Sequence, residues 1–165
     1  MRSSGKSPYL TNARRLADVI AALQATGTYK YYQLPFDGKG WAYRITGSAD
    51  DASSIREVFE QHPEFFRIDA SENGSLVWRR QHQKLYDVDR EVVITRDEYN
   101  RLDRGEKARV SRGPLGSTEL TALINAATEL HSRAVAQQAA RRWWVTPLVS
   151  VLSAFVGAVA GAAIS

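Results

Sequence analysis

The chain has 165 residues, no cysteine and a formal net charge of +4, and 44% of its residues are hydrophobic while 24% are charged. The absence of cysteine excludes disulfides, cysteine-ligated zinc and thiol catalysis. The length leaves room for one small domain beside any terminal segments. The mild positive charge is compatible with an anionic membrane surface or with nucleic acid, and it identifies neither.

The amino-terminal third of the chain predicts a helix and a hairpin. After a polar tail over residues 1–10, four apolar residues recur at i, i+3, i+4 and i+7, which indicates one buried helix face: Leu16, Val19, Ile20 and Leu23. Gly27 is expected to end this helix. Two aromatic-rich runs, residues 29–34 and 41–46, follow on either side of a segment containing proline and glycine. We expect these runs to pair as a β-hairpin with a longer turn.

The next segment predicts a second helix and a second hairpin. Acidic and hydroxyl residues can cap a helix over residues 52–62, and Pro63 can end it. Two strands, residues 65–69 and 75–80, then flank the dipeptide Asn73-Gly74, which is typical of a hairpin turn with positive φ. Farther along, Thr95 and Glu98 have the spacing of a capping box. A charged linker is expected over residues 104–116.

The order of these elements resembles a winged-helix domain over residues 12–84, most clearly where REVFEQHPEFFRI is followed by ENGSLVWRR. The resemblance implies an α+β fold in which a winged-helix-like cytosolic domain, residues 11–103, carries two β-hairpins. It also implies a helix that reads the major groove, yet the candidate helix carries Glu57 and Glu60 beside Arg56 and Gln61. Because carboxylates repel phosphates, we do not expect sequence-specific recognition through this helix.

Basic residues concentrate in the predicted hairpins and at their edges, where tyrosine and tryptophan are interleaved with them. This composition can hold a phosphate backbone and stack on bases. Exposed strands also carry lysine and arginine simply for solubility, which is the commoner case. The candidate residues for binding nucleic acid or another partner are Lys30, Lys39, Arg44, Arg79, Arg80 and Lys84.

No pattern in the sequence indicates catalysis. The three histidines, His62, His82 and His131, lack partners at the spacing of metal ligands. Carboxylates gather near predicted helix starts, where capping explains them. No glycine-rich phosphate loop or nucleophile elbow occurs in the sequence. We therefore expect a protein that is not an enzyme and has no catalytic residues, no metal and no cofactor.

Residues 117–142 predict an amphipathic helix. Its apolar residues are spaced by threes and fours and form a seam, namely Leu120, Leu123, Ile124, Ala127, Leu130 and Ala134. The seam can dock on the chain's own domain, or it can pair with other copies of the chain as a short coiled coil.

Residues 143–165 predict a single-pass membrane anchor at the end of this helix. From Val145 to Ile164 there is no charged, histidine or amide side chain, and such a helix matches the thickness of a bilayer. The residues that suit the membrane interface are Arg141, Arg142, Trp143 and Trp144. A small-residue face suited to helix packing in lipid comprises Ser153, Gly157 and Gly161.

These expectations combine into a membrane-anchored, non-enzymatic binding or sensor module that self-associates through its C-terminal helix. A bacterial anti-phage or toxin-type membrane effector is one form of this hypothesis. The alternative is a membrane-tethered winged-helix regulator that binds nucleic acid. The expected location is the inner, cytoplasmic membrane, with the N-terminal domain in the cytoplasm. The expected partners are the lipid bilayer, further copies of the chain, and a protein or a nucleic acid.

Overall fold

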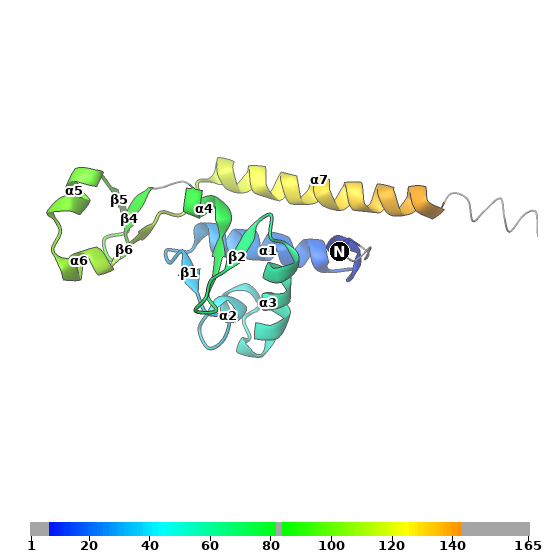
Figure 1. Cartoon of the computed structure of the whole chain (residues 1–165), viewed down its shortest axis with the longest axis horizontal. Coiled ribbons are helices and arrows are strands. Elements are labelled where there is room, and N and C mark those ends of the chain that lie inside the picture. The colour runs from blue at the N-terminus through cyan, green and yellow to red at the C-terminus, as the bar shows by residue number, and fades with distance from the viewer. Residues whose placement is uncertain (1–6, 82–83, 143–165) are drawn as a thin grey trace, which may run out of the picture.

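Two three-stranded antiparallel sheets and one long helix organise the part of the chain that the computed structural model describes, residues 7–81 and 84–142. The core contains η1 (Pro8–Leu10), α1 (Arg15–Thr28), β1 (Gln33–Leu34), α2 (Trp41–Thr46), η2 (Ala49–Asp51), α3 (Ala52–Gln61), β2 (Phe66–Ile68), β3 (Gly74–Leu76) and α4 (Val77–Gln81). A smaller outer unit contains β4 (Leu85–Asp87), β5 (Val92–Ile94), α5 (Arg96–Arg101), α6 (Arg104–Ala108) and β6 (Val110–Arg112). Figure 1 shows the outer unit beyond one end of the core, while α7 (Ser117–Arg142) runs along one side of it.

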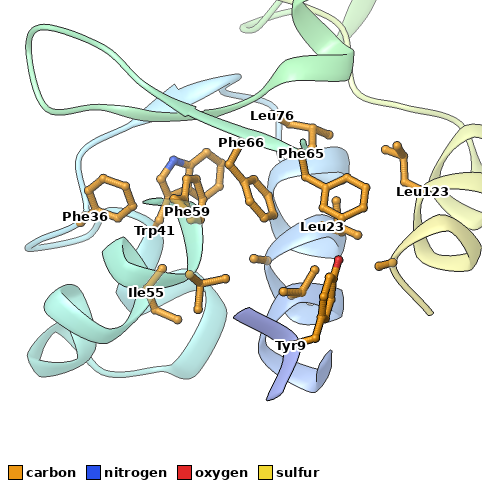
Figure 2. Packing of buried hydrophobic residues seen from close by; sticks show 14 of the residues in the cluster. Tyr9, Leu23, Phe36, Trp41, Ile55, Phe59, Phe65, Phe66, Leu76 and Leu123 are labelled. Atoms are coloured by element: carbon orange, nitrogen blue, oxygen red, sulfur yellow. The ribbon is translucent and has the colours of Figure 1, made fainter. Parts of the chain in front are cut away.

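Aromatic side chains fill the core between the sheet β1-β3-β2 and the helices. Phe59 stacks on Phe66 with ring centroids 4.3 Å apart, and Phe36 meets Phe59 edge-on at 5.0 Å (Figure 2). The indole N–H of Trp41 donates a hydrogen bond of 2.7 Å to the carbonyl oxygen of Gly74. This bond satisfies the one polar atom of a fully buried tryptophan and ties α2 to β3.

The outer unit is built on the sheet β5-β4-β6, and the capping boxes of its two helices fix where each helix begins. The Thr95 hydroxyl accepts from the N–H of Glu98 at the start of α5, as the sequence predicts. Asp103 and Glu106 form an equivalent pair at the start of α6. The outer unit therefore holds two ordered helix starts although it has few buried residues.

Helix α7 docks on the chain's own core through most of the predicted seam, although Leu130 is exposed. Leu123, Ala127 and Ala134 are buried in the hydrophobic cluster, and Leu120 and Ile124 pack against it. Figure 2 shows Leu123 pointing toward Leu23 of α1 and Phe65. The seam could dock on the chain's own domain or pair with another copy, and the described residues show docking on the chain's own domain. Pairing with another copy through the same face would require α7 to leave α1.

The predicted arrangement of two hairpins is wrong at the first hairpin. Residues 41–46 form helix α2 instead of a strand, and β1 pairs with β3. Trp41 and Ala42 are adjacent and both fully buried, whereas adjacent residues of a strand point to opposite faces of the sheet. Gly47 ends the helix in the left-handed conformation with φ 84°. The fold remains α+β, but with two three-stranded sheets. The range expected as a linker, 104–116, contains α6 and β6.

The predicted membrane anchor is corrected as well. No helix among residues 7–81 and 84–142 is long and apolar enough to cross a membrane. Within these residues the structure therefore gives no support to the predicted transmembrane fold or to the location at the inner membrane. Arg141 and Arg142 belong to the last turn of α7. The other residues of that prediction, including Trp143, Trp144, Ser153, Gly157 and Gly161, lie outside the described residues.

Candidate ligand-binding cleft

A hollow lined by basic side chains lies where the outer unit meets the core. It has a volume of about 740 Å³, and its described lining consists of Tyr32, Lys84, Leu85, Ile94, Arg96, Tyr99, Val110, Ser111 and Arg112. We call it the basic cleft. Its lining carries three cations and two tyrosines, and none of the described residues that form it is acidic.

Strand register and helix periodicity bring these residues together. Leu85 of β4 lies opposite Ile94 of β5 and opposite Arg112 of β6, so the three side chains share one face of the sheet. Arg96 and Tyr99 are three residues apart on α5 and therefore neighbour one another. The cleft is thus formed by three strands and one capped helix, with Tyr32 contributed by the core.

Each tyrosine of the basic cleft is paired with a guanidinium group. The Arg112 guanidinium lies 5.3 Å from the centroid of the Tyr32 ring, and that of Arg96 lies 5.5 Å from the centroid of Tyr99. A cation and the aromatic face that it lies over attract one another modestly at exposed sites. The arrangement holds two flat aromatic surfaces and two positive charges at the same opening.

The positive charge of the basic cleft is largely unneutralised. Arg96 and Arg112 form no ion pair within residues 7–81 and 84–142, and Lys84 approaches only Glu119, at 3.8 Å. The Glu98 carboxylate is engaged by Thr95. Hydrogen bonds from the backbone and hydroxyl of Thr95 hold the pKa of Glu98 below its ordinary value, so this carboxylate stays ionised and capped. An anion is the ligand that this charge distribution favours.

Arg79 is fully buried, and the backbone of Arg112 in the basic cleft is one of its partners. Its guanidinium donates hydrogen bonds to backbone carbonyl oxygens from both walls of the junction: Thr26, Tyr29, Lys30, Tyr31, Arg112 and Gly113. Burial lowers its pKa to about 10, which still leaves the side chain charged at neutral pH. Arg79 therefore positions the backbone beside Tyr32 and Arg112, and it is not accessible to a ligand.

The other predicted binding residues are scattered. Lys30 pairs with Glu91 at 3.3 Å, and Arg44 lies over the Tyr29 ring at 3.8 Å from its centroid. Lys39 is exposed in the loop before α2. Arg80 is exposed on α4, and its carbonyl oxygen accepts a hydrogen bond from Arg112. Only Lys84 of the predicted set lines the basic cleft.

Sequence reasoning missed Arg96, Tyr99 and Arg112 as cleft residues. Arg112 falls in the range expected to be a linker, so its place in a sheet could not be anticipated. Arg96 and Tyr99 carried a usable signal, because the Thr95 capping box fixes the start of α5 and sets both residues on one side of it.

A second polar cluster joins η1 to the end of α3. His62 is fully buried, its ring centroid lies 4.5 Å from that of Tyr9, and its Nδ1 lies 3.0 Å from a carboxylate oxygen of Glu64. The Tyr9 hydroxyl donates to the same oxygen at 3.3 Å. Burial, together with the charge of Glu64, raises the pKa of Tyr9, so its hydroxyl stays protonated as a donor. This cluster fastens the amino-terminal segment to the core.

Residues 7–81 and 84–142 hold no group of three or more histidine, cysteine, aspartate or glutamate side chains that could bind a metal ion. No protein family, no curated protein and no solved structure matches this chain. The winged-helix resemblance therefore assigns no family.

Proposed function

We propose that this chain is a non-enzymatic module that binds a nucleotide unit, a phosphate together with its flat base, in the basic cleft. The observation that carries the proposal is the pairing of unneutralised guanidinium groups with tyrosine rings at one opening, Arg96 with Tyr99 and Arg112 with Tyr32. Phosphates are bound most often by arginine and lysine, and bases stack on aromatic side chains.

The size and composition of the basic cleft support a ligand of this class. Ligand pockets commonly measure about 300 to 1,000 Å³, and the basic cleft measures about 740 Å³. Three of its described lining residues are apolar, namely Leu85, Ile94 and Val110. Apolar side chains beside a few cations suit a ligand that carries both a flat base and a phosphate.

The proposal assigns binding rather than a reaction to this site. The described lining includes no histidine, aspartate or glutamate, and these are the side chains that most often transfer protons in catalysis. Lys84, Arg96 and Arg112 offer charge and hydrogen-bond donors, which bind and orient a ligand.

Fluorescence anisotropy tests the proposal with the full chain and a labelled single-stranded DNA of about eight nucleotides. We expect saturable binding that Arg96→Gln weakens about tenfold, because a hydrogen bond to a charged group contributes about 1.5 to 3 kcal/mol. Arg67→Gln is the matched control, since Arg67 is exposed on β2 of the core sheet. Absence of binding, or an equal loss in the control, would overturn the proposal.

A further inference from the structure

A second hollow adjoins the basic cleft at strand β6. It measures about 450 Å³, and it shares Val110 and Ser111 with the basic cleft. Tyr32 lines the first hollow and its neighbour Tyr31 lines the second. Two hollows of different volume thus share residues of one strand, each with a tyrosine from the same segment of the core.

We infer that a single-stranded nucleic acid crosses β6, with successive bases on Tyr32 and Tyr31. This inference rests on the proposed function of the basic cleft and extends it from one nucleotide unit to several. The strand order β5-β4-β6 makes β6 an edge of its sheet among the described residues. A chain can pass from one hollow to the other over this edge, because no further strand is paired to it there.

The exposed tyrosine of the second hollow suits base stacking. Tyr31 has 41% of its surface exposed, although it is a large aromatic residue. Its ring lies 5.7 Å from that of Tyr29, centroid to centroid, and the Lys30 ammonium lies 5.8 Å from its centroid. A base that stacks on Tyr31 would place its phosphate near a cation, as single-strand-binding sites do.

The cation beside Tyr31 can exchange its partner. Lys30 pairs with Glu91 at 3.3 Å, and both side chains are more than one third exposed. Exposed ion pairs contribute little stability, about 0 to 1 kcal/mol. Lys30 can therefore leave Glu91 for a phosphate at small cost, whereas Arg109 is held by the buried carboxylate of Asp87 at 3.1 Å.

This geometry favours a single strand over a duplex. Stacking on Tyr31 and Tyr32 needs bases whose flat faces are uncovered. In a duplex, the neighbouring base pairs cover these faces. Recognition by stacking also tolerates any base. The inferred ligand is therefore single-stranded nucleic acid without strong sequence preference.

A length series with the full chain tests the inference by competition against a labelled single strand of about eight nucleotides. Unlabelled thymidine monophosphate, the single strand and its duplex are the competitors. We expect the single strand to compete at least tenfold better than the mononucleotide and better than the duplex. Tyr31→Ala should weaken the single strand about five- to hundredfold, as stacking energies imply, and leave the mononucleotide unchanged, whereas Tyr32→Ala should weaken both.

Two further variants separate stacking from folding. Tyr31→Phe keeps the ring and should retain affinity, and Tyr43→Ala removes an exposed tyrosine of α2 and should change nothing. If the single strand competes no better than the mononucleotide, or if Tyr31→Ala has no effect on it, the path over β6 is overturned while the proposed function stands. If neither ligand binds, the proposed function itself fails.

Discussion

The Nη1 atom of Arg79 donates a hydrogen bond of 2.7 Å to the carbonyl oxygen of Tyr29, and its Nε donates one of 3.1 Å to the carbonyl oxygen of Gly113. One buried side chain thereby joins the segment after α1 to the segment after β6. The basic cleft lies at this junction, so its shape depends on a residue that no ligand can touch.

Replacing Arg79 with methionine should destabilise the fold by about 3 to 5 kcal/mol, because several buried carbonyl oxygens lose their donor at once. Urea unfolding followed by circular dichroism measures the change. Arg80→Met is the control, since its side chain is exposed on the same helix and its loss should cost less than about 0.5 kcal/mol. Similar losses in the two variants would contradict the role given to Arg79.

The ionisation of Asp87 should make the stability of the fold depend on pH. Burial raises the pKa of its carboxyl, but hydrogen bonds from the Arg90 and Asp89 N–H groups and from Arg109 outweigh burial and hold the pKa below its ordinary value of 3.8. A depressed native pKa stabilises the fold above the ordinary value, and this contribution is lost as the pH falls through the native pKa.

Asp87→Asn should therefore lower the free energy of unfolding most at neutral pH. The gap to the unmodified chain should shrink as the pH falls below 3.8. Urea titrations across the acidic range measure this gap, and Asp37→Asn, in the exposed loop before α2, serves as the control. A gap that grows with acidity would show that the sign is wrong.

Ala127 tests the docking of α7 on the core. It is fully buried, whereas Ala122 on the same helix is exposed. Ala127→Leu should cost about 1 to 3 kcal/mol through overpacking, and Ala122→Leu should lie within about 0.5 kcal/mol of the unmodified chain. Thermal unfolding of both variants provides the measurement. A harmless Ala127→Leu would mean that α7 does not pack on α1 through this face.

Gly74 is required for packing rather than for a turn. A Cβ atom at this position would lie 2.7 Å from Cε1 of Phe59 and 2.8 Å from Cζ of Phe36. Gly74→Ala should therefore destabilise the chain by about 1 to 3 kcal/mol. Gly105→Ala on α6, where the Cβ would meet only a side-chain oxygen of Asp103 at 3.3 Å, should be tolerated. Chemical denaturation of the two variants compares them directly.

Gly74 also shows how far local sequence signals reach. The pairing of β2 with β3 was predicted from Asn73-Gly74, but the left-handed residue of this turn is Glu72, with φ 64°. Two N–H groups, of Ser71 and Asn73, donate to the Asp69 side chain and shape the loop instead. The predicted strand over residues 75–80 is wrong beyond Leu76, because residues 77–81 form α4. The turn itself depends on a side chain and on aromatic packing from α3.

Features that depend on one helix or strand alone are predictable from the sequence, whereas features that depend on contacts with other elements are not. The burial of Val19 and Leu23 of α1 and the capping box of α5 follow from spacing alone, whereas the buried Arg15 and Thr26 of α1 do not. The run from Trp41 to Thr46 suits a strand or a short helix equally, and burial of both Trp41 and Ala42 decides for the helix. Arg79 looked like an exposed strand residue, because nothing in the sequence indicates the carbonyl oxygens that surround it.

The most direct test of the basic cleft is the salt dependence of single-strand binding by the full chain and by Arg112→Gln. If Lys84, Arg96 and Arg112 each neutralise a phosphate, the logarithm of the affinity should fall against the logarithm of the salt concentration with a slope of about −2. Arg112→Gln should reduce the magnitude of this slope by about 0.7, and Arg67→Gln should leave it unchanged. An affinity that is indifferent to salt, or a slope that Arg112→Gln does not alter, would contradict phosphate binding in the basic cleft.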